Sequence, residues 1–196
     1  MTANVESLVP VAKSWREIYQ TYNLLKQCQD QILEEHGLTS EQFGVLAVIT
    51  YIGGPANVTD IARWLARSTN SVSMIVDRMV KAGLVKRTRD RSDRRVVYVT
   101  VTNKAQAAFK PAYVAVVEFV RKIFQPLSYE DANTLLGLLG SVKYEILKYS
   151  NPEVDIKEVK RLEQKQLDNT MRWLNESGLL SAPAAKRRSV KKVKAA

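Results

Sequence analysis

Hydrophobic positions recur along most of this chain at three- and four-residue intervals, a spacing typical of helices that bury one face. It predicts a long helix over residues 7–36, closed by Gly37, and a second helix over residues 39–52. In the second helix, Thr39 and Gln42 have the spacing of a capping box. Residues 7–52 are therefore expected to be almost entirely helical.

The helical spacing returns after residue 102. It predicts helices over residues 103–125 and 128–149, the second capped by Ser128. A further, partly amphipathic helix is expected to start at the segment 151–153, Asn-Pro-Glu, and to run to about residue 177. These outer helices carry more apolar side chains than a small central unit covers, which leaves two interpretations: a helical dimer interface, or a monomeric helical domain packed on the centre.

The central segment, residues 58–102, has a different pattern, with two short helices, a tight turn and a hairpin. Thr59 is the expected N-cap of the first short helix, and Ser68 that of the second. Gly83 is expected to end the second helix in a left-handed conformation. This order of elements predicts a winged helix-turn-helix.

The second short helix, residues 68–82, has two unlike faces. Its apolar face is predicted to point inward and consists of Val72, Ile75, Val76 and Met79. Its other face carries the candidate DNA-contacting residues Ser68, Thr69, Asn70, Ser71, Ser73, Met74 and Arg78. Short polar side chains let a backbone approach a ligand closely while still donating and accepting hydrogen bonds, as a recognition helix does in a major groove.

Two strands, residues 84–88 and 96–102, are predicted to flank a strongly charged loop, residues 89–95. Four arginines at a hairpin tip repel one another and add nothing to a core, so an external anion is one explanation and a solvated loop the other. Behind a helix-turn-helix, the anion is favoured. Arg94 and Arg95, with Asp93 beside them and Arg91 nearby, are then candidates for contact with a narrow minor groove.

These motifs, in this order, resemble the MarR-type transcriptional regulators. The resemblance covers residues 39–103 and rests on an LT-x-x-Q-F-x-V-L run, an I-A-x-x-L helix, an S-x-x-x-V-S-x-x-V-D-R-M helix, a G-L-V-x-R turn and a D-R-R wing. It is weaker over residues 7–150. It implies a two-fold symmetric dimer that binds DNA, often a repressor released by a small ligand or by oxidation. Two departures stand out: Ala105 where glycine is usual, and 46 residues after Ser150, near which the family generally ends.

Charge follows the same division of the chain. The net charge is +10, and residues 56–110 carry twelve basic and four acidic side chains. Residues 181–196 carry six basic side chains and no acidic one, and this tail is expected to be disordered, serving either solubility or non-specific DNA binding. Positive charge concentrated in the winged segment and the tail indicates a polyanionic partner.

Composition argues against several other classes. One cysteine and one histidine leave no zinc site built on paired thiolates, no disulfide framework and little for catalysis, so we expect neither an enzyme nor a bound cofactor or metal. No signal segment or membrane-length apolar run is found, which predicts a cytoplasmic protein.

Two further features each leave two interpretations open. Cys28 is either a small buried hydrophobic residue or a peroxide sensor. The aromatic residues Trp15, Tyr19, Tyr22 and Trp64 either belong to the core or line a pocket for an aromatic effector.

The sequence thus predicts a mostly α protein with a small β-hairpin wing. The expected division is an N-terminal dimerisation helix (1–37), a winged helix-turn-helix DNA-binding domain (38–102), C-terminal dimerisation helices (103–150), a helical extension (151–178) and a basic tail (179–196). The leading function is a homodimeric repressor that reads a pseudo-palindromic operator in double-stranded DNA, with the helix of residues 68–82 in the major groove and the wing in the minor groove. The alternatives are a protein-interaction module with a DNA-binding tail, and a redox-sensing regulator that uses Cys28.

Overall fold

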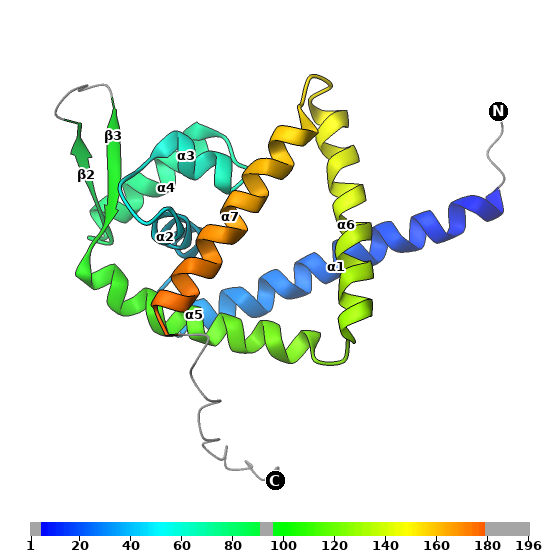
Figure 1. The fold of residues 1–196 in the computed structure, drawn as a ribbon. Helices are drawn as coiled ribbons and strands as arrows, with labels where there is room; N and C mark the ends of the chain where they lie inside the picture. Colours follow the sequence, from blue (N-terminus) through cyan, green and yellow to red (C-terminus); the bar gives the residue numbers. More distant parts are fainter. Residues whose placement is uncertain (1–4, 91–95, 179–196) are drawn as a thin grey trace, which may run out of the picture.

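The computed structural model describes residues 5–90 and 96–178 and is mostly helical (Figure 1). The helices are α1 (Val5–Glu34), α2 (Ser40–Ile52), α3 (Val58–Trp64), α4 (Thr69–Lys81), α5 (Asn103–Phe124), α6 (Tyr129–Ser150) and α7 (Ile156–Glu176). The strands are β1 (Ala56–Asn57), β2 (Val85–Arg89) and β3 (Val97–Val101). The predicted fold class, mostly α with a small hairpin wing, is confirmed.

Three of the helix starts predicted from polar residues are found. Thr39 and Gln42 form the capping box of α2, with the Thr39 hydroxyl accepting from the Gln42 backbone N–H at 3.2 Å. The Ser68 and Ser128 hydroxyls accept from the N–H groups of Ser71 and Asp131, at 3.2 and 3.1 Å. Each side chain satisfies a donor that the first turn of a helix leaves unpaired.

Two predicted helix starts are wrong. Helix α3 is capped by Asn57 and not by Thr59, because the Asn57 side chain accepts from the Asp60 N–H at 2.8 Å and the helix begins one residue before Thr59. Helix α7 does not begin at residues 151–153. The Asn151 N–H donates to the Leu147 carbonyl at 2.9 Å, which makes Asn151 the end of α6.

The cap of α7 is Asp155, whose carboxylate accepts from two backbone N–H groups, those of Lys157 at 2.8 Å and Glu158 at 3.3 Å. A carboxylate is favoured at the positive end of a helix dipole. Asp155 therefore provides both the hydrogen bonds and the charge that the helix start requires.

The sheet has three antiparallel strands in the order β1-β3-β2, one more than predicted. Val99 of β3 pairs on one side with Ala56 of β1, the strand that was not predicted. On its other side it pairs with Arg87 of β2, within the hairpin. Strand β3 is therefore central. Only Val99 of this strand is fully buried, and Tyr98 and Thr100 are half-buried like Val97 and Val101, so the predicted one-sided alternation is only partly found.

The buried core lies where α2, α3, α4, the sheet and the first half of α5 meet. The four apolar residues of α4 that were predicted to face inward are each at most 2% exposed to solvent. Helix α6, in contrast, has no buried residue, and much of α1 is also exposed. Figure 1 shows α6, the N-terminal half of α1 and the far end of α5 on the side of the molecule away from the wing.

Helix α7 packs across the front of this core. It contacts α2 and crosses it in Figure 1 on its way from the end of α6 to α5. Near its C-terminal end, the Trp173 ring meets Tyr113 edge-on at 4.6 Å between centroids, and lies 5.7 Å from Tyr51 and 6.0 Å from Phe109. The helical extension is thus packed on α2 and α5 through an aromatic cluster.

Candidate nucleic-acid interface

The first turn of α4 presents short polar groups to solvent on a fixed backbone. Ser68, Thr69 and Asn70 are exposed, and the Ser68 cap holds the turn in place. Ser71 and Ser73 are half-buried, and Met74 is 66% exposed although it is apolar. The hydrophobic packing of the opposite face therefore orients the polar face outward.

The turn that joins α3 to α4 is closed by the backbone. The Arg67 N–H donates to the Ala62 carbonyl at 3.0 Å, and Ala66 between them has φ 50°, in the left-handed region. A residue with a Cβ is disfavoured there by roughly 1–2 kcal/mol. The helix-turn-helix angle is maintained in spite of this local strain, by the core that α3 and α4 share.

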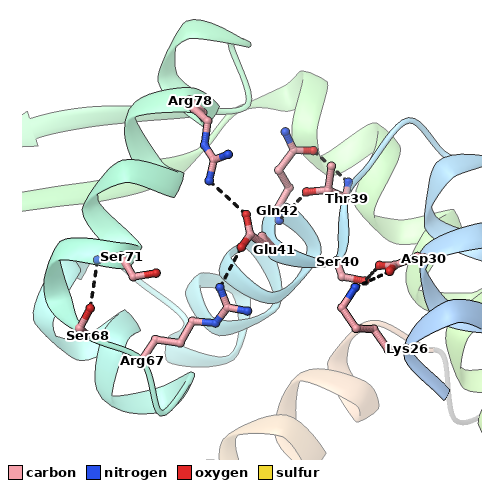
Figure 2. Close-up of polar contacts among 10 residues, drawn as sticks. All are labelled: Lys26, Asp30, Thr39, Ser40, Glu41, Gln42, Arg67, Ser68, Ser71 and Arg78. Atoms are coloured by element: carbon pink, nitrogen blue, oxygen red, sulfur yellow. Dashed lines mark hydrogen bonds and ion pairs between the residues drawn. The ribbon is translucent and has the colours of Figure 1, made fainter. Parts of the chain in front are cut away.

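Glu41, at the start of α2, lies between two arginines of the helix-turn-helix. Its carboxylate oxygens are 3.0 Å from Arg67 and 3.1 Å from Arg78, and Figure 2 shows it between the two guanidinium groups. Arg67 precedes α4, and Arg78 is on its last full turn. The predicted DNA contact Arg78 is thus held toward α2 in this structure, and all three side chains remain partly exposed.

A second ion pair connects the wing to α4. Arg87 of β2 is paired with Asp77 of α4, and its other guanidinium nitrogen lies 3.5 Å from the Ser73 carbonyl. Val58, Ser73, Arg87, Arg89 and Val97 line a cleft of about 480 Å³ between α4 and the hairpin. This pairing connects the outer strand of the hairpin to α4.

The hairpin tip lies outside the described residues. Arg91, Asp93, Arg94 and Arg95 fall within it, and their predicted role stays a prediction. At the neck of the hairpin the Asp90 N–H donates to the Val96 carbonyl at 2.9 Å. The tip is therefore carried by a paired two-stranded stem.

A polar contact between α1 and α2 lies beside this surface. Lys26 and Ser40 both bind the Asp30 carboxylate (Figure 2). Their hydrogen bonds hold the pKa of Asp30 below its usual value. Thus α2 carries both Ser40, bound to α1, and Glu41, bound to the two arginines.

The four aromatic residues predicted to line an effector pocket are not brought together within one chain. Trp15, Tyr19 and Tyr22 lie on α1 and are 60–68% exposed. Trp64 lies on α3 and meets Tyr51 at 6.1 Å between ring centroids. Their role as a ligand site stays a prediction.

Cys28 is half-buried in a cleft of about 380 Å³ between α1, α5 and the start of α6. The other side chains that line this cleft are almost all apolar, and none of the lining residues described is charged. A thiolate is stabilised by nearby cations, and the cleft offers none. The surroundings of Cys28 are those of a packing residue.

The described part of the chain contains no group of three or more His, Cys, Asp or Glu side chains placed to hold a metal ion. None of the helices in residues 5–90 and 96–178 has the combination of length and apolarity needed to cross a bilayer.

Three contacts at this interface were not found by sequence reasoning. Glu41 and Arg67 are 26 residues apart, Glu41 and Arg78 are 37 apart, and Asp77 and Arg87 are 10 apart across a turn. Local spacing rules relate only residues three or four apart on one helix. For the two Glu41 pairs the sequence carries no local signal, whereas Asp77 directly precedes Arg78 on the outward face of α4.

Together, a capped polar helix in a helix-turn-helix, an adjoining basic hairpin and a shared hydrophobic core define a winged helix-turn-helix protein, a DNA-binding class. Residues 36–96 match the sequence profile of the MarR family.

The HTH-type transcriptional regulator MgrA of Staphylococcus aureus is 29% identical over 128 residues, which span 63% of this chain and 85% of MgrA. PecS of Dickeya dadantii is 26% identical over 126 residues, 63% of this chain and 76% of PecS.

Solved structures show the same fold. The organohalide-sensing transcriptional regulator RdhR, in a form bound to 2,4-dichlorophenol, superposes with a TM-score of 0.65 at 24% identity, over 78% of this chain and 87% of that one. A mutant of MarR from E. coli, complexed with operator DNA, gives 0.61 at 21% identity, over 71% and 99% of the two chains. The chain is therefore a winged helix-turn-helix protein whose residues 36–96 match the MarR family, and over 63% of its length it is similar to HTH-type transcriptional regulators.

Proposed function

We propose that this regulator is a homodimeric repressor of a pseudo-palindromic operator, with residues 68–82 in the major groove and the wing, residues 89–95, in the minor groove. The observation that carries the proposal is the exposed polar turn of Ser68, Thr69 and Asn70, which the Ser68 cap and the buried face of α4 hold in a fixed position. Side chains of this length on a fixed helix start are suited to reading base edges.

Two further observations support the same arrangement. The Arg87–Asp77 pair fixes the wing beside α4, so that one protomer is expected to contact adjacent grooves of the same duplex. The operator-bound relative from E. coli shares the fold. A DNA partner is also consistent with the expected cytoplasmic location, because a bacterial chromosome lies in the cytoplasm.

The dimer is supported by apolar side chains that one chain leaves in solvent. On α6, Leu136 is 70% exposed and Leu138 63%, and on α1 Val11 is 63% exposed. Large apolar side chains left exposed on several helices are typical of an interface between subunits. Two-fold symmetry would place two recognition helices one turn of DNA apart.

Small-molecule control is the remaining part of the proposal, and RdhR, solved with 2,4-dichlorophenol, supports it. Control by oxidation of Cys28 is not part of the proposal, because no charged residue lines the cleft that contains Cys28. The protein-interaction alternative is not favoured, because the outward face of α4 is mostly polar and an interface hot spot would be aromatic or otherwise apolar at its centre.

The test is selection of genomic DNA fragments by the purified protein, followed by footprinting. We expect a two-fold symmetric site, and Asn70→Ala should change base preference at one position per half-site by roughly 1–3 kcal/mol. Asn133→Ala, on the exposed face of α6, is the matched control and should bind as the unaltered protein does. An asymmetric footprint, or equal weakening on all sequences by Asn70→Ala, would contradict the proposal.

A further inference from the structure

Helices α5, α6 and α7 form the three sides of a triangle (Figure 1). Residues 125–128 join α5 to α6, and residues 151–155 join α6 to α7. The third corner is not covalent: Trp173 of α7 makes it, with its ring 4.6 Å from that of Tyr113 of α5. Because a helix has a fixed rise per residue, the angles of such a triangle change only if a helix bends or a corner opens. Helix α7 therefore sets the direction of α6 relative to α5.

The two halves of α5 have different surroundings. Ala105, Phe109 and Ala112 are at most 4% exposed and belong to the core of the winged unit, the part of the chain from α2 to β3. Within α5, no residue after Tyr113 is buried. The core thus fixes the first half of α5 but not the half that leads to α6.

Pro111 lies where these two halves meet. It has no backbone N–H, so a hydrogen bond between successive turns is missing and the helix bends more easily there. Phe109 and Tyr113 flank the proline, and the Trp173 ring contacts both, at 6.0 and 4.6 Å between centroids. Trp173 also lies 5.7 Å from Tyr51 of α2. Its ring therefore bridges α5 across the proline and connects the bridge to the winged unit.

The corner between α6 and α7 is held by side chains as well as by the chain itself. Glu163 of α7 accepts hydrogen bonds from Lys143 and Tyr144 of α6, each at 2.8 Å. The ammonium group of Lys160 lies 4.8 Å from the centroid of the Tyr144 ring, a cation–π contact. Helix α7 is thus attached to α6 near one end and to the winged unit near the other.

We propose that α7 is a brace that holds the winged unit at one angle to α6, so that only one spacing of operator half-sites is bound tightly. The inference rests on the function proposed above, in which α6 belongs to the interface between two protomers. In that dimer, the angle between α6 and the winged unit determines how far apart the two recognition helices lie.

The geometry of DNA shows why the brace restricts spacing. One base pair inserted between two half-sites moves them apart by about 3.4 Å and rotates them by roughly 35° about the duplex axis. A dimer whose winged units are braced does not follow both displacements. A dimer without the brace follows them by bending α5 at Pro111.

The brace itself is tested without DNA, by double electron–electron resonance between spin labels on Lys81→Cys of α4 and Lys148→Cys of α6. Both positions are exposed, and the labelled chain carries Cys28→Ser and is diluted with unlabelled chain. We expect one narrow distribution of distances. Trp173→Ala should broaden it, whereas Asn175→Ala, at a neutral exposed position of the same helix, should not.

Trp173→Ala risks unfolding α7, so a second variant opens another corner and leaves the aromatic cluster intact. About ten glycine and serine residues are inserted between Ser150 and Asn151, together with Glu163→Gln, which leaves α7 docked on the winged unit but joined to α6 by a flexible linker. This variant should also broaden the distribution. The control carries Glu163→Gln with the same insertion after Gly178, where no corner is formed, and should keep the narrow distribution. An unchanged distribution in the linker variant would overturn the brace.

Operator affinity is then measured on duplexes with the selected spacing and with one base pair more or fewer. The unaltered chain should bind the altered spacings at least about a hundredfold more weakly, because one half-site is lost. For the linker variant this penalty should fall to about tenfold or less. Equal penalties in the two chains would overturn the role in spacing. A chain with the narrow distribution that selects no two-fold site would instead refute the proposed function, and with it the role in spacing, while the brace stands.

Discussion

Glu41 is the residue through which α2 meets both arginines of the helix-turn-helix. Its two oxygens are shared between Arg67 and Arg78, which a phosphate backbone would also attract. We therefore expect the carboxylate and DNA phosphates to compete for the same two guanidinium groups. Exposed ion pairs of this kind contribute about 0–1 kcal/mol to stability, so their importance lies in charge and placement.

Glu41→Gln removes this competition while keeping the side chain's length. We expect the free energy of unfolding to change by less than about 1 kcal/mol. Affinity for unrelated DNA should rise at low salt, with a slope of log affinity against log salt steeper by about 0.9 for each additional phosphate that an arginine neutralises. Fluorescence anisotropy over a salt series measures both the affinity and the slope.

The control is Glu130→Gln, which makes the same charge change at the exposed start of α6. It should shift DNA affinity less, because α6 lies on the side of the molecule away from the wing (Figure 1) and no ion pair joins Glu130 to an arginine of the described helix-turn-helix. A loss of operator affinity in Glu41→Gln would show the opposite role, in which Glu41 holds the arginines ready for DNA.

At the scale of elements, the attachment of α7 to α6 depends on Glu163. Burial alone would raise the pKa of this carboxyl, but hydrogen bonds from Lys143 and Tyr144 outweigh it and hold the pKa below the usual value of 4.5. A carboxylate whose folded pKa is lowered stabilises the protein above its unfolded pKa. That contribution is lost as the pH falls through the folded pKa.

Glu163→Gln should therefore destabilise the protein at neutral pH, by up to about 1 kcal/mol because the pair is partly exposed. The difference from the unaltered chain should shrink as the pH falls through the lowered pKa of Glu163 and disappear below it, where the glutamate is itself protonated. Urea unfolding over a series of pH values from neutral to acid measures this. Glu176→Gln, at the exposed end of α7, is the control, and a Glu163→Gln deficit that persists in acid would mean that shape and not charge matters.

Element boundaries show what the sequence could and could not predict. Helices with strong periodicity and a local cap were predicted within two or three residues, as at Thr39, Ser68 and Ser128. Strand β1 was missed because it has two residues and is created by pairing with Val99, more than 40 positions away. The start of α7 was misplaced because Asn-Pro-Glu imitates a helix start, whereas the carboxylate of Asp155 provides two hydrogen bonds.

The candidate site divides in the same way. The polar face of α4 follows from helical periodicity, which separates it from Val72 and Met79 without any tertiary information. The pairs Glu41–Arg78 and Asp77–Arg87, and the docking of Trp173 on α5, depend on how separate elements meet. No pattern within a single element contains that information.

At the scale of the whole molecule, α6 is the clearest indication of a second copy. It has no buried residue, although Leu135, Leu139, Val142 and Ile146 follow one stripe of its surface. An isolated helix of this kind leaves its apolar face in water, which costs free energy that association recovers. The proposed dimer covers this stripe.

Leu135→Lys with Leu139→Lys should convert the dimer to monomers, because an unpaired charge buried in an apolar seam costs several kcal/mol. Sedimentation velocity measures the assembly, and circular dichroism reports whether the helices persist. Asn133→Lys with Ser141→Lys adds the same charge to other faces of α6 and should leave the dimer intact. A folded monomer in the unaltered protein would contradict both the dimer and the two-fold operator.

The strand order β1-β3-β2 has a consequence for synthesis on the ribosome. Strand β1 and the hairpin strand β2 both pair with β3, so the α3–α4 unit cannot acquire its sheet until residues 97–101 have left the exit tunnel. The aromatic cluster waits longer still, because Trp173 emerges some sixty residues after its partner Tyr113. The nascent chain therefore exposes α1, α5 and α6 before α7 can dock, and a neighbouring chain on the same message would meet those apolar helices at that stage.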